Sequence, residues 1–195
     1  MHPGIYDTVI EWIPKGARVL DLGAGDGAFL QRLVQTRQVA GEGVEQDATL
    51  VGRCVERGLV VHQGDIANGL DQYGQHAFDY VLLLGTFQEL VSPAEIVREA
   101  FRVGQQVIIA YSNFAYLGVR AQILLQGRTP VTRSLPLPWY QTPNLHFLSI
   151  IDFRDFCRDI GVRETQCAYF NSRGPVRYLP NLRAEESVCL LRRSP

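Results

Sequence analysis

The feature that most constrains the fold of this chain is an apolar strand that runs directly into an acidic, glycine-rich loop. Residues 19–27 read V-L-D-L-G-A-G-D-G. The alternating glycines tolerate a tight turn and let the backbone approach a ligand, and the helix that follows points its unpaired N–H groups at the same place. A small polar ligand is therefore expected at this loop.

The charge of the loop indicates which ligand that is. The pattern G-x-G-x-x-A at residues 23–28, with Glu45 about twenty positions further along, also fits the dinucleotide-binding fingerprint. Two carboxylates, Asp21 and Asp26, would repel a pyrophosphate in a partly desolvated site. They would attract a ligand that carries an ammonium and a sulfonium. S-adenosylmethionine (SAM) is such a ligand, and we expect its amino-acid end to face the loop.

Two further acids follow the next two predicted strands. Residues 39–45 are predicted to form a strand that ends at Glu45, whose two oxygens can accept both ribose hydroxyls. Residues 59–66 are predicted to form a strand that ends at Asp65, placed to accept the adenine amino group. Because open parallel sheets bind ligands beyond the carboxyl ends of their strands, these acids and Asp21 are expected to line one crevice. The alternative is that each acid only caps the helix that follows it.

Length and composition fit one enzyme-sized domain over residues 1–195, with 46% hydrophobic and 20% charged residues. The formal net charge of −1 gives no reason to expect nucleic acid or an anionic membrane as a partner. We find neither a signal-like start nor an apolar run long enough to span a bilayer, so a cytoplasmic protein is expected. No C-x-x-C pair occurs, which predicts no metal site and four buried thiols, at Cys54, Cys157, Cys167 and Cys189.

Helix and strand patterns alternate along the chain as in a doubly wound α/β sheet. A continuous apolar run at residues 78–84 predicts a strand buried on both faces. The apolar stripe Leu50, Val51, Cys54 and Val55 predicts a helix packed on the core. The remaining predicted elements are helices at residues 5–13, around 29–34, from 93 and at 151–159, and strands at 107–110, 162–170 and 188–191.

That order resembles the class I SAM-dependent methyltransferases. The resemblance implies a Rossmann-like, seven-stranded, mostly parallel sheet with one antiparallel late strand. It also implies SAM or S-adenosylhomocysteine as cofactor, with the glycine loop at the methionine end, Glu45 at the ribose, Asp65 and Ile66 at the adenine, and residues 85–88 facing the reactive methyl. The cofactor contacts expected in this way are Asp21, Gly23, Ala24, Gly25, Gly27, Glu45, Gln46, Asp65, Ile66 and Gly85.

The segment at residues 111–150 is too long for an ordinary connection, which is typical of a functional insertion. It carries N-F, then V-R-x-Q-x-L-L-x-G-R-x-P-V-T, then W-Y-x-T-P-N-x-H. This pattern resembles the MetW family of methionine-biosynthesis proteins, a branch of the same superfamily. The resemblance implies a homoserine O-acetyl- or O-succinyltransferase subunit as partner, and does not by itself imply methyl transfer.

Within this segment, His146 is the candidate catalytic base, since its ordinary pKa of about 6.5 suits proton transfer near neutrality. The alternative is that His146 binds a loop carbonyl and holds the segment closed. Aromatic and basic residues in the segment have the composition of interface anchors, or of a lid over the pocket. They are Tyr116, Trp139, Tyr140, Arg120, Arg128 and Arg133. Two functions stay open: a SAM-binding protein that supports or regulates the acyltransferase, and a methyltransferase that acts on a small molecule.

Overall fold

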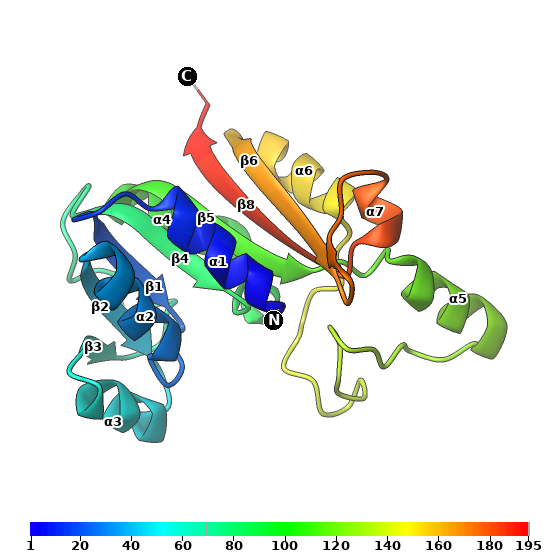
Figure 1. Cartoon of the computed structure of the whole chain (residues 1–195), viewed down its shortest axis with the longest axis horizontal. Coiled ribbons are helices and arrows are strands. Elements are labelled where there is room, and N and C mark those ends of the chain that lie inside the picture. Colours follow the sequence, from blue (N-terminus) through cyan, green and yellow to red (C-terminus); the bar gives the residue numbers. More distant parts are fainter. Residues whose placement is uncertain (69, 195) are drawn as a thin grey trace.

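The predicted alternation of strands and helices folds into one twisted sheet with helices on both faces (Figure 1). The computed structural model describes residues 1–68 and 70–194. The strand order is β3-β2-β1-β4-β5-β8-β6-β7. The strands are β1 (Arg18–Leu22), β2 (Ala40–Glu45), β3 (Val60–Gln63), β4 (Phe78–Leu84), β5 (Gly104–Ser112), β6 (Val162–Asn171), β7 (Gly174–Pro175) and β8 (Glu186–Arg193).

The helices lie between the strands along the chain, as the alternating pattern predicts. They are α1 (Pro3–Trp12), α2 (Ala28–Arg37), α3 (Ala48–Glu56), α4 (Pro93–Val103), α5 (Leu117–Gln126), α6 (Ile150–Asp159), α7 (Pro180–Arg183) and a short 3₁₀ helix, η1 (Phe87–Glu89). None of the described helices is long and apolar enough to cross a membrane.

Strands β1 to β5 run parallel, and β8 lies antiparallel between β5 and β6, which confirms the expected late strand. The predicted count of seven strands is wrong, because the described chain has an eighth. That strand is β7, whose two residues Gly174 and Pro175 pair with the end of β6. Two residues are too few to show a period-two pattern, so the sequence gives no signal for it.

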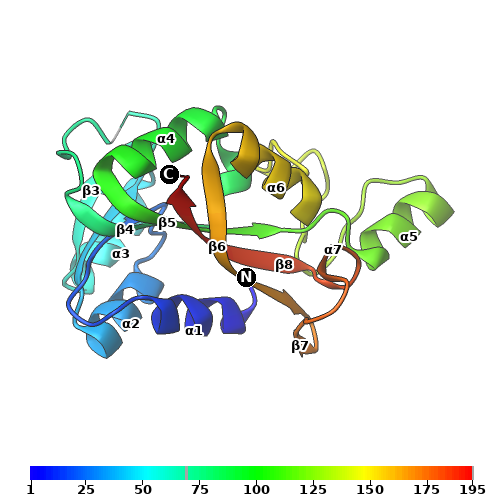
Figure 2. The same ribbon diagram turned by 90° about the horizontal axis from the view of Figure 1, so that it is seen from above.

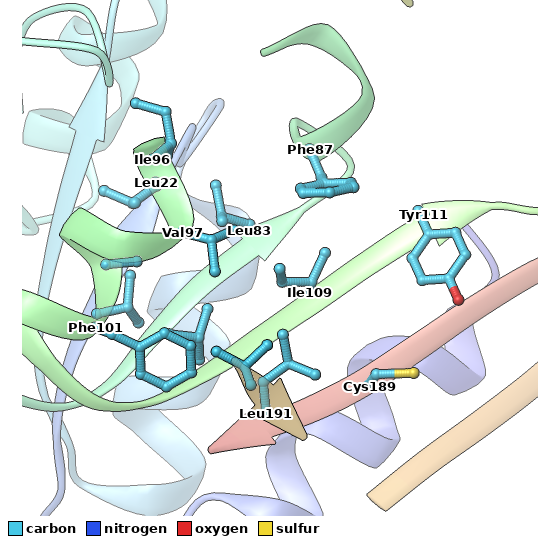
Figure 3. Packing of buried hydrophobic residues seen from close by; sticks show 14 of the residues in the cluster. Leu22, Leu83, Phe87, Ile96, Val97, Phe101, Ile109, Tyr111, Cys189 and Leu191 are labelled. Atoms are coloured by element: carbon cyan, nitrogen blue, oxygen red, sulfur yellow. The ribbon is translucent and has the colours of Figure 1, made fainter. Parts of the chain in front are cut away.

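The central strands are buried on both faces because their side chains alternate between two cores. In β4, Val81 and Leu83 face the core beneath α4 and α6 (Figure 3), whereas Tyr80 and Leu82 face the core beneath α1 and α2. Figure 2 shows these two helix layers on opposite sides of the sheet. The carboxyl ends of β1 to β4 are thereby held at one edge, where the glycine loop lies.

The predicted core stripe on α3 is only partly correct. Cys54 is fully buried, but Val55 is 60% exposed. α3 packs mainly on β3, the strand at the edge of the sheet. An edge strand covers less of a helix than a central one does, so one side of the stripe remains in solvent.

The expectation of four free buried thiols is also wrong. Cys167 and Cys189 stand directly opposite each other on β6 and β8, with their Cα atoms 4.3 Å apart, and form a disulfide. The free cysteines of the described chain are Cys54 and Cys157, and both are buried. The one group of potential metal ligands among the described residues is Glu164 with this cysteine pair, whose sulfurs are already joined.

The connection between β5 and α6 projects from the end of the sheet, and α5 forms its outermost part (Figures 1 and 2). Val119 is the buried residue of this helix, whereas Leu124 and Leu125 are 83% and 80% exposed. Further along, Trp139 and Tyr140 are also mostly exposed and pack edge to face on each other. The projecting segment therefore presents apolar side chains that nothing in the described chain covers.

Candidate functional site

The glycine loop is shaped by positive φ angles and by hydrogen bonds to β2. Gly23 has a φ of +82°, and its N–H donates to the Val44 carbonyl at 2.9 Å. Gly25 has a φ of +60°, and a Cβ added there would meet nothing within 4 Å. Its N–H donates to Glu45 Oε2 at 2.8 Å. The loop is therefore locked against the sheet on one side and open on the other, where a ligand can approach.

Two cavities meet at this loop, at the carboxyl ends of β1 to β4. The first, which we call the loop cavity, has a volume of about 420 Å³ and is lined by Tyr6, Asp21, Gly23, Ala24, Gly25, Asp26, Ala28, Phe29, Arg32 and Leu84. The second, which we call the acidic cavity, has a volume of about 850 Å³ and shares Gly23 and Gly25 with the first. Its other predicted site residues are Glu45, Gln46, Asp65 and Ile66.

Two of the predicted cofactor contacts lie outside these cavities. Gly27 is the N-cap of α2, and the space beside it is filled by Leu59 and Cys54. Gly85 lines a third cavity, of about 250 Å³, which we call the small cavity. Gly27 thus shapes the start of the helix, whereas Gly85 lies where an acceptor would be held in the methyltransferase interpretation.

The acidic cavity has a strong charge imbalance. Neither lysine nor arginine is among the described residues that line it, but five carboxylates are. Glu99 is compensated by an ion pair with Arg102 at 2.7 Å. The others are Glu45, Asp65, Glu89 and Glu95. This arrangement attracts cations and repels phosphates.

Asp21 is the most deeply buried acid of the site, with 4% of its surface exposed. Burial raises the pKa of this carboxyl to about 7, and the nearby negative charge of Glu45 adds to the effect. A cation beside Asp21 would favour its ionised form. The residue is therefore suited to bind an ammonium group.

Asp26 is different, although it lies on the same loop. Arg57 contacts its Oδ2 at 2.8 Å, and the Ala28 N–H donates to its Oδ1. The hydrogen bond from Ala28 and then the one from Arg57 lower the pKa of this carboxyl. Because its charge is compensated, Asp26 contributes less to the repulsion of a phosphate than the sequence predicts. The acids of the acidic cavity supply that repulsion instead.

Glu45 lies at the end of β2, as predicted, but its carboxylate is already engaged. Oε2 accepts from Gly25, and Oε1 accepts the backbone N–H groups of Gln46 and Asp47 at 2.9 and 3.0 Å. The cap of α3 is Asp47 and not Glu45, since the Asp47 side chain accepts from Thr49 and Leu50. A carboxylate offers about four acceptor positions, so Glu45 retains one of them, on Oε2.

Asp65 and Ile66 follow β3, which ends two residues before the predicted site acid, at Gln63. Asp65 is exposed, and one of its oxygens accepts the Ala67 N–H at 2.9 Å. Ile66 packs against the core beneath α4 and also lines the acidic cavity. The two residues thus offer a carboxylate and an apolar surface side by side.

His146 lies in a different setting from the one expected of a base. Its Nε2 donates to the Leu90 carbonyl at 2.9 Å, and its backbone N–H donates to the Gln88 carbonyl. The Gln88 side chain in turn donates to the His146 carbonyl. None of the three cavities is lined by this histidine. The geometry favours the alternative in which His146 holds the segment in place, and a catalytic role stays a prediction.

Sequence reasoning missed several residues of the site. Thr86 contacts Gly23 and its hydroxyl donates to the Leu22 carbonyl at 3.1 Å, which joins the loop after β4 to the glycine loop. Glu89 lines both the acidic and the small cavity. The available signal was the position of Glu89, one residue beyond the predicted wall at residues 85–88. Glu95 and Glu99 lie four residues apart on α4, which puts them on one face of the helix.

Comparison with known proteins gives one family and one fold. The family model described as "Methionine biosynthesis protein MetW" matches residues 5–191. A curated relative, "Bifunctional methionine biosynthesis protein MetXA/MetW" of Rhodopirellula baltica, is 33% identical over 165 residues. That match covers 80% of this chain and 26% of the relative, so the chain spans about a quarter of the relative's length.

Solved structures show the same fold at low identity. One is a SAM-dependent methyltransferase from Thermotoga maritima, described as a possible histamine N-methyltransferase, with a TM-score of 0.70 at 19% identity. The alignment covers 98% of this chain and 88% of the Thermotoga chain. Magnesium protoporphyrin IX methyltransferase from Synechocystis PCC 6803 with bound S-adenosylhomocysteine also has a TM-score of 0.70, at 16% identity. That alignment covers 98% of this chain and 83% of the Synechocystis chain. The predicted class I methyltransferase fold is confirmed.

Proposed function

The chain belongs to the family of methionine biosynthesis protein MetW, and from this premise we propose that it binds SAM and supports or regulates a homoserine O-acyltransferase. The acidic cavity at the carboxyl ends of β1 to β4 is the main observation that supports SAM as the ligand. It is large, it opens beside the glycine loop and it holds carboxylates without lysine or arginine among its described lining residues. A cationic nucleoside fits this chemistry and a dinucleotide does not.

Each part of the proposed ligand has a matching group. The SAM ammonium pairs with Asp21, whose raised pKa makes it responsive to a neighbouring cation. One ribose hydroxyl donates to the remaining acceptor position of Glu45. The second can donate only if one of the three backbone N–H groups now bonded to Glu45 releases its hydrogen bond. The adenine lies between Ile66 and the carboxylate of Asp65. S-adenosylhomocysteine shares the ammonium, ribose and adenine and binds at the same place.

We expect Glu45→Ala to weaken SAM binding by about 1.5–3 kcal/mol, or roughly ten- to a hundredfold, because hydrogen bonds to a charged group are lost. Isothermal titration calorimetry measures this difference. Glu42→Ala is the matched control, since Glu42 lies on the same strand and lines none of the three cavities. Unchanged affinity in Glu45→Ala would contradict the placement, and tighter binding of NAD than of SAM would contradict the ligand.

The proposed partner is supported by the relative from Rhodopirellula baltica, whose name joins MetXA and MetW in one protein. Functions carried by one chain in one organism are often carried by associating chains in another. The exposed apolar side chains of α5, with Trp139 and Tyr140, offer a surface for such an association. Arg128 and Arg133, on the same segment, are exposed and can pair with acids on the partner.

Methyl transfer to a small molecule is the second candidate function, and the small cavity next to Gly85 is the observation that favours it. Histidine, lysine and cysteine are absent from the described residues that line this cavity. The Met1 amino group is engaged by Glu186, so the described lining offers no free base with an ordinary pKa near neutrality.

For this reason we expect methyl transfer to free metabolites to be slow or absent, well below about one turnover per second. A screen with methyl-labelled SAM over amino acids, homoserine derivatives and phenols measures it. Turnover near that rate, abolished in His146→Ala while SAM affinity is retained, would reverse the order of the two functions.

A further inference from the structure

The small cavity is built by five separate parts of the chain. The loop after β4 contributes Gly85, Gln88 and Glu89, and the end of β5 contributes Tyr111 and Ser112. The projecting segment contributes residues between 134 and 144, and Met1 and Glu186, at the start of β8, complete the lining. Glu89 also lines the acidic cavity, so the two cavities adjoin at this side chain. The small cavity has a volume of about 250 Å³, just below the range of about 300–1,000 Å³ that is typical of ligand pockets, so it suits a small molecule.

Two carboxylates line the small cavity, and they differ in how far they are compensated. Glu186 lies 3.8 Å from the Met1 ammonium and accepts the His2 N–H at 2.8 Å. Glu89 has neither an ion pair nor a side-chain hydrogen bond with any other described residue. Lysine, arginine and histidine side chains are absent from the described lining. Glu89 is therefore an exposed carboxylate at the wall that no other described side chain compensates.

The neutral polar groups of the cavity differ in the same way. The Ser112 hydroxyl donates to the Ser134 carbonyl at 3.0 Å, and both ends of the Gln88 amide are bonded. By contrast, the Asn144 side-chain amide makes no hydrogen bond to another described residue. The Thr142 hydroxyl accepts the Asn144 N–H at 3.2 Å and keeps its own hydrogen to donate. The Tyr111 hydroxyl is buried in the core, so the side-chain groups that remain available to a ligand are the Glu89 carboxylate, the Asn144 amide and the Thr142 hydroxyl.

We propose that the small cavity is a second ligand site, which binds a small amine that also carries a hydroxyl or carbonyl group. The ammonium of this ligand pairs with Glu89, and its neutral polar group bonds to Asn144 and Thr142. An anionic ligand is disfavoured because the described lining has no basic side chain and its Met1 ammonium is already paired with Glu186. This site goes beyond the proposed SAM site and does not require that SAM be bound.

The surroundings of Glu89 support a cation at this position. Partial burial raises the pKa of its carboxyl, and the negative charge of Glu45 raises it further. An ammonium group beside Glu89 offsets both effects, because a nearby positive charge favours the ionised carboxylate. The Asn144 amide and the Thr142 hydroxyl both lie on the projecting segment and line the cavity. They bond to the neutral polar group at the other end of the ligand.

The test compares three molecules of similar size: aminobutanol, which is a cation, butanediol, which is neutral, and hydroxybutyrate, which is an anion. Each is titrated into the whole protein without SAM at about physiological salt, and backbone amide NMR shifts of Gly85, Ser112 and Asn144 are followed. Aminobutanol is expected to bind at least about tenfold more tightly than the other two. Because SAM is absent, failure here would leave the proposed SAM site untouched.

Two variants assign the effect to residues. Glu89→Gln is expected to lower aminobutanol affinity to that of butanediol, whereas Glu56→Gln, which removes an exposed acid outside the cavities, leaves it unchanged. Asn144→Ala is expected to lower aminobutanol affinity to that of butylamine, which lacks the hydroxyl. Equal affinity for the three molecules, an equal loss in Glu56→Gln, or shifts confined to residues 21–27 would each overturn the proposal.

Discussion

The Asp21→Asn variant is expected to be more stable than the unsubstituted protein at about pH 8 and equally stable near about pH 4. Burial raises the pKa of Asp21 from 3.8 to about 7 in the folded state. As the pH rises through this window, the unfolded chain releases the proton while the folded protein retains it. Folding stability therefore falls from about pH 4 to about pH 7, and the loss is complete above that.

The size of the effect follows from the shift. A pKa difference of about three units corresponds to about 4 kcal/mol, which is an upper limit for what a neutral asparagine of the same shape can restore. Urea unfolding followed by circular dichroism, at about pH 4 and about pH 8, measures it. The same substitution removes the proposed partner of the SAM ammonium, so we expect SAM affinity to fall by about tenfold or more. Stability and binding are thus expected to change in opposite directions.

Asp26→Asn is the matched control, because Asp26 lies on the same loop but has a lowered pKa. Its ionised form is favoured in the folded state, so its removal is expected to lower stability at about pH 8, and only slightly because the side chain is 41% exposed. A pH dependence of unfolding that is the same in the Asp21 variant and in the unsubstituted protein would contradict the interpretation of Asp21.

The second large effect is expected at the projecting segment. Trp139→Ala should weaken association with the proposed partner, a homoserine O-acyltransferase, by at least about 2 kcal/mol, roughly thirtyfold, if Trp139 anchors the interface as an exposed aromatic side chain can. Association is measured by sedimentation or by pull-down from mixtures of the two purified proteins. SAM binding is expected to change little, because Trp139 lines none of the three cavities.

Val55→Ala provides the comparison at a distant surface. Val55 is 60% exposed on α3, which lies at the opposite end of the molecule from α5 (Figure 1). Its truncation should leave association unchanged. If Trp139→Ala and Arg128→Ala both leave the complex intact and weaken SAM binding instead, the segment is a lid over the pocket and not a partner surface.

The segment turns some of its side chains toward a cavity and others toward solvent. Its residues between 134 and 144 form a wall of the small cavity, whereas Trp139 and Tyr140 within that stretch are exposed. A contiguous stretch of sequence does not reveal which side chains point inward, because residues 127–149 have no helix or strand whose period would sort them. The sequence alone therefore does not distinguish a lid over the pocket from a surface that contacts a partner.

The strand ends were the most predictable part of the site. β4 occupies the predicted residues 78–84, since a strand buried on both faces reads as an unbroken apolar run. Asp21 and Glu45 lie at the ends of β1 and β2, where the pattern places them, because parallel strands bring their carboxyl ends to one edge. These features depend on local pattern and on one topological rule, and a single sequence contains both.

Features that depend on pairing between distant segments were not predictable. Cys167 meets Cys189 only because β6 and β8 pair in a register that shifts between Glu164 and Gln166. The compensation of Asp26 by Arg57 requires that α2 and the end of α3 lie together. Glu89 could be noticed in the sequence, but its lack of a partner follows from the arrangement of every neighbour around it. Charge compensation is a property of the assembled site and not of its spacing.

The position of β8 between β5 and β6 has a consequence for how the chain matures. Both of its neighbours precede β8 in the sequence, so a growing chain synthesises them before the strand that joins them. Until then β5, with Val107, Ile108 and Ile109, presents an unpaired apolar edge, which is a template for aggregation. During synthesis the chain is therefore prone to aggregate at β5, a strand that lies in the interior of the finished sheet.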